Sequence, residues 1–156
     1  MTSHENTLPG AAALDGVRPS GCGRDRLLRV LVVEDSRLNA LALSHLLAGC
    51  SCEPHCAADG PEALERLRRS AYDLVLMDLD LPGMDGMEAA RAIRSGEAGP
   101  AARDVPIVAI AARATALERA RCLRAGMDGF VPRPFARETL GETIRRVLER
   151  PEDSRG

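Results

Sequence analysis

The chain has 156 residues, 45% of them hydrophobic, which is enough for one domain with a single buried core and too little for two full domains. Its formal net charge of -2 gives no strong attraction to nucleic acid or to anionic lipid. With two Phe, one Tyr and no Trp, the core must be built from aliphatic side chains and methionine, which suits helices packed on a sheet.

The cellular compartment follows from the N-terminus and the cysteines. The first 20 residues have no basic opening and no sustained apolar run, so neither a secretory signal nor a membrane span is expected. The five cysteines are odd in number and irregularly spaced, which argues against a disulfide framework. We therefore expect a protein of the reducing cytoplasm that has no membrane partner.

The ends of the chain differ from its middle in composition. Residues 1–26 mix Gly, Pro, Ala, Ser and isolated charges without periodicity, which predicts a flexible N-terminal arm, and residues 151–156 predict a flexible tail. Between them, residues 27–150 alternate short apolar runs with segments of helical period, which predicts one folded domain.

The first half of this domain predicts two strands, each followed by a helix. Residues 28–33 form a Val-rich apolar run, and residues 52–57 form a weaker strand. Ser36 stands where an N-cap belongs, and Gly49 ends the first helix. The apolar positions at helical spacing are Leu38, Leu41, Leu43, Leu46 and Leu47 in the first helix, and Ala63, Leu64 and Leu67 in a second helix opened by Asp59, Gly60 and Pro61.

The second half continues the same alternation after a further strand. A turn is predicted at residues 81–86, where Pro and Gly occur together, and Gly126 ends a later helix. The expected strands are residues 72–77, 105–111 and 129–131, and the expected helices are residues 88–95, 117–125 and 137–150.

A fivefold alternation of strand and helix predicts an α/β fold. Its strands are parallel, its crossovers are right-handed, and helices cover both faces of the sheet. We expect a doubly wound (βα)5 domain of the flavodoxin-like type, with five strands in the order 2-1-3-4-5. In such sheets, ligands bind beyond the carboxyl ends of the strands at the point where strands 1 and 3 adjoin.

Three carboxylates fall at that point. Glu34 and Asp35 follow the first strand directly, and Asp78 closes the third. Crowded anions at a strand end are relieved by a hard divalent cation, and Mg²⁺ prefers a few carboxylates together with water and phosphate oxygens. Because Asp78 follows an apolar strand, its carboxylate is oriented but reachable, and it can attack phosphorus to form an acyl phosphate.

These acids lie in segments that resemble the signature segments of response-regulator receiver domains. The resemblance covers residues 29–150 and is closest to the receivers of hybrid histidine kinases and phosphorelays. The segments are residues 32–39 (VVEDSRLN), 77–86 (MDLDLPGMDG), 88–94 (EAARAIR) and 125–130 (AGMDGF).

The resemblance implies a role for each site residue. Asp78 is then the phosphoacceptor, and Glu34 and Asp35 position magnesium together with Asp78 and the main-chain carbonyl of Asp80. Phe130 takes the aromatic switch position. The donor is a phosphohistidine on a histidine kinase or a histidine phosphotransfer protein, which docks near the active-site loops and the first helix, and the output goes to a downstream protein.

Two positions depart from the receiver pattern. Ala111 stands where receivers usually carry Thr or Ser at the end of the fourth strand, and Thr115 is four residues too late to be assumed as a substitute. Arg133 stands where they usually carry Lys, before a proline expected to be cis. Arg offers phosphate two parallel hydrogen bonds and is not equivalent to Lys. We therefore expect phosphorylation to persist and its coupling to residues 117–150 to weaken.

Several alternatives are weighed against this interpretation. The departures at Ala111 and Arg133 also fit a degenerate receiver that is not phosphorylated and serves as an interaction module. Residues 78–81 (DLDL) resemble the motif of haloacid-dehalogenase phosphatases, but a complete β-α-β-α segment precedes them. The basic runs at residues 66–69 and 145–146 lie among Glu residues on predicted helices, as solvated faces do. A zinc site is disfavoured by the irregular spacing of Cys50, Cys52, His55 and Cys56.

Overall fold

The computed structural model describes residues 26–149. The predicted arm up to residue 25, the predicted tail 151–156 and the last residue of the predicted closing helix lie outside the described residues. Within residues 26–149, none of the helices is long and apolar enough to cross a membrane.

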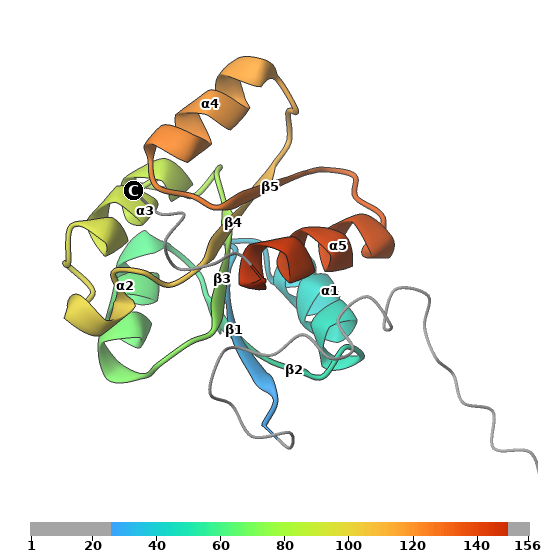
Figure 1. The fold of residues 1–156 in the computed structure, drawn as a ribbon, viewed down its shortest axis with the longest axis horizontal. Coiled ribbons are helices and arrows are strands. Elements are labelled where there is room, and N and C mark those ends of the chain that lie inside the picture. The colour runs from blue at the N-terminus through green and yellow to red at the C-terminus, as the bar shows by residue number, and fades with distance from the viewer. Residues whose placement is uncertain (1–25, 150–156) are drawn as a thin grey trace, which may run out of the picture.

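A five-stranded parallel sheet in the order β2-β1-β3-β4-β5 forms the centre of the molecule and confirms the predicted doubly wound α/β fold (Figure 1). Neighbouring strands pair in parallel register, with Val33 opposite Ala57 on one side and Met77 on the other. The strands are β1 (Leu28–Val33), β2 (Cys52–Ala57), β3 (Leu74–Asp78), β4 (Ile107–Ala111) and β5 (Gly129–Pro132).

Helices cover both faces of the sheet. Helices α1 and α5 lie on one side, and α2, α3 and α4 lie on the other (Figure 1). A short 3-10 helix at Pro100–Ala102, which the sequence did not predict, leads into β4. The α-helices are α1 (Arg37–Ala48), α2 (Gly60–Arg69), α3 (Gly86–Arg94), α4 (Ala116–Arg124) and α5 (Arg137–Leu148).

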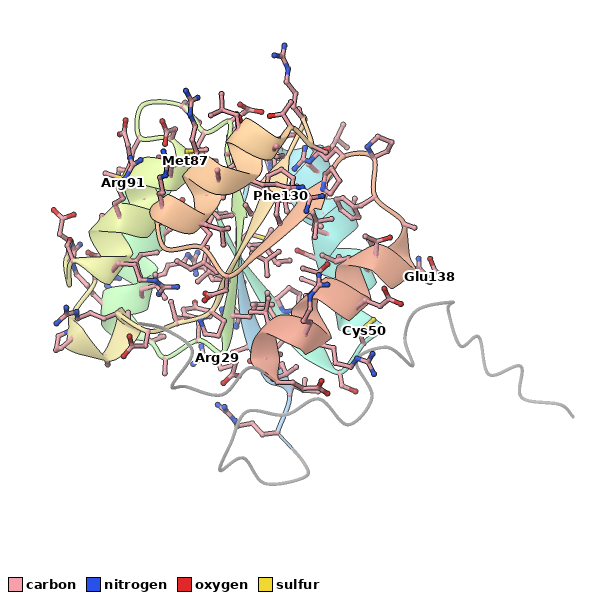
Figure 2. All side chains as sticks on the ribbon, turned by 45° about the horizontal axis from the view of Figure 1, so that its top comes forward. Arg29, Cys50, Met87, Arg91, Phe130 and Glu138 are labelled. Atoms are coloured by element: carbon pink, nitrogen blue, oxygen red, sulfur yellow. The ribbon has the colours of Figure 1, made fainter. Side chains whose placement is uncertain are left out.

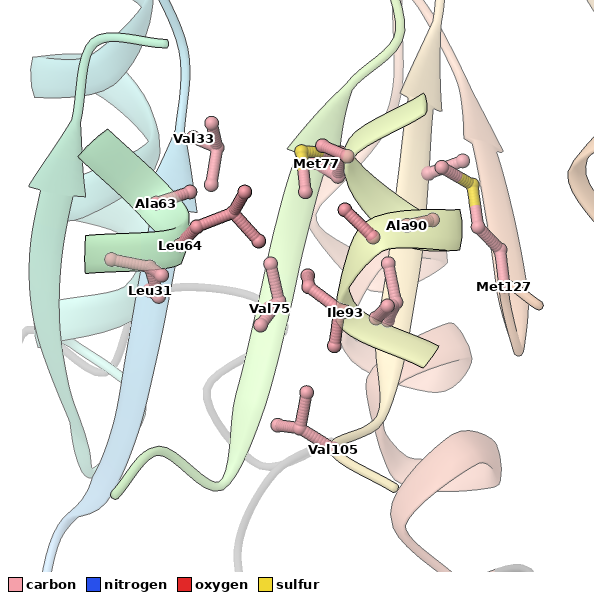
Figure 3. Close-up of a cluster of buried hydrophobic side chains, with 14 of the residues drawn as sticks. Leu31, Val33, Ala63, Leu64, Val75, Met77, Ala90, Ile93, Val105 and Met127 are labelled. Carbon is pink, nitrogen blue, oxygen red and sulfur yellow. The ribbon is translucent and has the colours of Figure 1, made fainter. Parts of the chain in front are cut away.

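The core divides into two layers because successive side chains of a strand point to opposite faces. Val30 and Val32 of β1 pack with the α1 and α5 side, whereas Leu31 and Val33 pack with the α2 and α3 side (Figure 3). The middle strands are buried on both faces, and β3 is buried over its full length. This continuous burial explains their unbroken apolar runs.

The boundaries that differ from the prediction have local causes. Helix α3 begins at Gly86 because the Asp85 side chain accepts the Glu88 N–H at 2.9 Å and so acts as its N-cap. Strand β4 begins at Ile107, after Pro106, which has no N–H to donate to a neighbouring strand. Strand β3 begins and ends later than predicted, so that Asp78 is its last residue.

The leucine spacing of α1 predicted the helix correctly, but it does not define the buried face. Leu43 and Leu47 are buried together with Ala40, whereas Leu38 and Leu41 are 80% and 67% exposed. Ser36 is the N-cap, as predicted, and accepts the Asn39 N–H. An apolar strip on α1 therefore faces away from the core, next to the end of β1.

Candidate phosphoacceptor and metal site

The three predicted carboxylates meet at one edge of the sheet. Strands β1 and β3 are paired neighbours, so residues that follow Val33 lie beside Asp78. One oxygen from each of Glu34, Asp35 and Asp78 can be chosen such that all three lie within 4.8 Å of one another. The predicted juxtaposition of the three acids is therefore what the structure shows.

Glu34 is a buried carboxylate, 4% exposed, with both oxygens engaged. Its Oε1 accepts the Ser36 N–H at 3.2 Å and the Asn39 Nδ2 at 3.4 Å. Its Oε2 accepts Arg133 Nη2 at 2.5 Å, in a contact between residues 99 apart in the chain. These donors hold the carboxylate in one orientation.

The pKa of Glu34 results from opposing effects. Burial raises it, but interactions with the Asp78 side chain and with Arg133 outweigh burial, and the Ser36 N–H adds to them. The net result is a pKa below the ordinary value of a glutamate. Glu34 therefore stays ionised more readily than Asp78, whose pKa is raised.

Asp78 is also buried, at 6% exposed, but its environment acts in the opposite direction. Burial raises its pKa to about 6, and Glu34 adds to the increase, although the Asp80 N–H and Arg133 oppose it. Its Oδ1 accepts the Asp80 N–H at 3.0 Å, and its Oδ2 lies 3.9 Å from Arg133 Nη2. Asp78 is thus an oriented carboxylate that a nearby cation would favour in its charged form.

Asp35 and Asp80 differ from these two residues because their side chains are exposed. Asp35 supplies the solvent-facing carboxylate of the cluster. Asp80 contributes its N–H to Asp78, and only its main chain is assigned a place in the predicted metal site. All the candidate ligands are oxygen atoms, which suits a hard cation such as Mg²⁺.

Two residues that support the site were not predicted as functional. A Cβ on Gly86 would lie 2.4 Å from the carbonyl oxygen of Asp78, so glycine at this position lets α3 approach the backbone of the phosphoacceptor. Asn39, which the sequence singled out only as part of a motif, donates to Glu34. For Gly86, the available sequence signal was the Pro-Gly turn that precedes it. For Asn39, the signal was the helix cap at Ser36.

The predicted departures lie on the β4 and β5 side of the site. Ala111 is the last residue of β4, and its carbonyl accepts the Arg133 N–H at 2.7 Å. The Arg133–Pro134 bond is cis, as the resemblance implied. Thr115 accepts the Glu118 N–H at 3.1 Å as the N-cap of α4, so its hydroxyl already has a structural partner. Phe130 lies on β5 (Figure 2), with the Arg119 guanidinium 4.9 Å from its ring centroid.

The cysteine cluster does not favour zinc. Among residues 26–149, the side chains of Cys50, Cys52, His55 and Cys56 do not come together as a group of potential metal ligands. Burial raises the pKa of Cys52 to about 12, so this thiol is protonated at neutral pH. Cys50 is also buried, and Cys56 is exposed with its sulfur 3.3 Å from the Ser44 Oγ. Cys50 and Cys52 therefore act as small buried apolar residues, as expected.

Comparison with known proteins finds relatives along most of the described chain. The family model described as the response regulator receiver domain matches residues 30–145. The sensor protein GacS of Pseudomonas syringae pv. syringae is 38% identical over 119 residues, which are 76% of this chain and 13% of that protein. The response regulator MprA of Mycobacterium leprae is 36% identical over 129 residues, covering 81% of this chain and 54% of MprA. The chain thus spans only part of these relatives.

A solved structure gives a further comparison. The receiver domain of the sensor histidine kinase PA1611 from Pseudomonas aeruginosa PAO1 has a TM-score of 0.72 and 34% identity, over 80% of this chain and 99% of that domain. That structure has a magnesium ion coordinated in its active-site cleft.

Proposed function

Because this chain belongs to the response regulator receiver family, a signalling module rather than a turnover enzyme, we propose that Asp78 accepts a phosphoryl group from a phosphohistidine donor in a two-component system or phosphorelay. Receiver domains generally take phosphoryl groups from histidine kinases. The supporting observation is that Glu34 and Asp35 place their carboxylate oxygens beside Asp78 at the sheet edge.

The transfer is a displacement at phosphorus. An oxygen of the Asp78 carboxylate forms the new bond to phosphorus, while the bond between phosphorus and the donor imidazole nitrogen breaks. The bonding electron pair stays on that nitrogen, which takes up a proton, and the product is an aspartyl phosphate and a histidine. Hydrolysis of the acyl phosphate later returns the carboxylate.

The residues around Asp78 have separate roles in this proposal. The Asp80 N–H orients the nucleophile, and Arg133 is placed to contact the phosphoryl oxygens. The three carboxylates and the main-chain carbonyl of Asp80 would hold Mg²⁺, which when bound would neutralise charge on the reacting oxygens. The magnesium of the PA1611 receiver supports this assignment.

The docking surface for the phosphodonor protein extends from Asp78 to the exposed apolar strip of α1. Leu38 and Leu41 are largely exposed on the helix that begins just after Asp35. A shallow groove beside them is lined by Leu41, Ala42, Ser44, His45, Leu46, Ala48 and Pro54. We assign this strip to an apolar helical surface of the histidine kinase or phosphotransfer protein, and place the exchange in the cytoplasm, with residues 27–150 as the receiver unit.

A second candidate function rests on Ala111. A receiver without a hydroxyl at this position lacks one hydrogen bond to the phosphoryl group, so the domain could serve as a protein-interaction module that is never phosphorylated. The two functions differ in whether Asp78 is labelled. The intact acidic cluster favours the phosphoacceptor.

Intact-mass analysis with acetyl phosphate and Mg²⁺ tests the proposal. We expect the wild-type chain to gain one phosphoryl group and Asp78→Asn to gain none. Glu142→Gln is the matched control, because Glu142 is an exposed acid on α5 with no role in the site, and this variant should be labelled like the wild type. Absence of labelling in the wild type, or labelling that persists in Asp78→Asn, contradicts the proposal.

A further inference from the structure

Arg133 places a protein cation inside the acidic cluster. Its Nη2 lies 2.5 Å from Glu34 Oε2 but 3.9 Å from Asp78 Oδ2, so its direct hydrogen bond is to the proposed metal ligand and not to the phosphoacceptor. The Arg133 side chain is 28% exposed, whereas those of Glu34 and Asp78 are 2% and 8% exposed. The guanidinium therefore enters a buried anionic site from a position open to solvent.

This contact competes with a metal ion. Glu34 Oε1 already accepts two hydrogen bonds, and Oε2 is the oxygen paired with Arg133. A guanidinium keeps its charge throughout the physiological pH range, so proton loss cannot release Glu34. A divalent ion at the three carboxylates would lie within a few ångströms of that charge, where repulsion between cations is strong.

We propose that Arg133 is a displaceable internal cation: it occupies Glu34 in the unphosphorylated protein, weakens magnesium binding there, and moves to the phosphoryl oxygens when the metal takes Glu34. This inference rests on the proposed function and deepens it. Arg133 is a positioning residue for the metal and a binding residue for the phosphoryl group. Magnesium and the phosphoryl group then bind cooperatively, because each makes room for the other.

The surroundings of Arg133 permit this exchange. Its backbone is anchored by the N–H donated to the Ala111 carbonyl, while its side chain is long and partly solvated. Asp78 is near enough that a modest rotation of the side chain redirects the guanidinium from Glu34 toward a group on Asp78. The Ala111 side chain has no donor for a phosphoryl oxygen, which makes the paired donors of Arg133 more important there.

Calorimetric titration of the full chain with MgCl2, without any phosphodonor, tests the first half of the proposal. We expect Arg133→Ala to bind Mg²⁺ about tenfold more tightly than the wild type, because both the repulsion and the competition for Glu34 are removed. Arg133→Lys should lie between them. Arg124→Ala, which removes an exposed charge in the last turn of α4, is the control for net charge and should bind as the wild type does.

Equal or weaker binding by a folded Arg133→Ala variant overturns the inference, and so does an equal gain in Arg124→Ala. Thermal unfolding shows whether each variant is folded, and Arg133→Lys keeps the test valid should the alanine variant unfold. If neither the wild type nor any variant binds Mg²⁺, the proposed function fails together with this inference. If Arg133→Ala binds more tightly but Asp78 cannot be labelled, only the proposed function fails.

Beryllofluoride, a stand-in for the phosphoryl group, tests the second half. We expect it to increase the Mg²⁺ affinity of both proteins, because the anion contacts the metal in each, but to increase that of the wild type about tenfold more than that of Arg133→Ala, where no guanidinium is available to move. Equal increases in the two proteins would show that Arg133 adds nothing to the coupling between the metal and the phosphoryl group, and would overturn the proposal.

Discussion

The two sides of the sheet edge differ in how many of the side chains typical of a receiver they carry. On the β1 and β3 side, Glu34, Asp35 and Asp78 converge, and main-chain and side-chain donors orient two of them. On the β4 and β5 side, the last residue of β4 is Ala111, which has no hydroxyl, and the aromatic residue Phe130 lies against Arg119. Accepting a phosphoryl group and transmitting that event to the α4 surface are therefore separable properties.

The two properties depend on different interactions. Glu34 and Asp78 interact strongly because both are buried, so their arrangement costs free energy in the resting protein. On the β4 and β5 side, the contact of Phe130 with the exposed Arg119 is individually weak. Variants on the first side should accordingly have larger effects than variants on the second.

The largest expected effect is on stability, in Asp78→Asn. Burial raises the pKa of Asp78 to about 6 in the folded protein, above its value of 3.8 as a model group. The free energy of unfolding therefore falls as the pH rises from about 4 to about 6. Over this range the unfolded carboxyl ionises freely, whereas in the folded state the charge is disfavoured by burial. A neutral amide avoids this cost, so we expect Asp78→Asn to be about 1 to 3 kcal/mol more stable than the wild type at pH 7.5.

Urea unfolding across pH, in the presence of a metal chelator, measures this difference. The advantage of Asp78→Asn should shrink as the pH falls from 6 to 4, where the wild-type carboxyl becomes protonated. Asp80→Asn, on an exposed side chain, should show no such trend. If Asp78→Asn is no more stable than the wild type at pH 7.5, burial of the Asp78 charge does not lower the stability of the folded protein.

Restoring a hydroxyl on the β4 side should have an intermediate effect. We expect Ala111→Thr to shift Phe130 further toward its beryllofluoride-bound arrangement. The free energy of that conformational equilibrium should change by about 1 kcal/mol, the contribution of one ordinary hydrogen bond. Ala111→Val is the matched control, because it adds a side chain of nearly the same shape without the hydroxyl. Amide chemical shifts of Gly129 and Phe130 report the response, and equal responses in the two variants would contradict the prediction that the missing hydroxyl weakens coupling.

Sequence reasoning predicted the fold because its signals are periodic and local. The alternation of apolar runs and helical segments was enough for the strand order, and the strand ends were enough to bring Glu34 and Asp78 together. The pairing of Arg133 with Glu34 was not predictable, because the two residues are 99 positions apart and their contact depends on how far a side chain reaches. The exposure of Leu38 was missed because helical spacing does not say which face is buried.

The smallest expected effect is at the contact between Arg119 and Phe130. The guanidinium lies 4.9 Å from the ring centroid, and Arg119 itself is exposed, so the cation–π interaction is worth about 0.5 to 1 kcal/mol. We expect Arg119→Ala to lower the free energy of unfolding by that amount and to let the ring of Phe130 exchange between rotamers without any phosphoryl analogue. NMR of the aromatic side chain measures the exchange, with Arg121→Ala, an exposed arginine of the same helix, as the control. Identical ring dynamics in the two variants would show that Arg119 does not hold the aromatic residue in place.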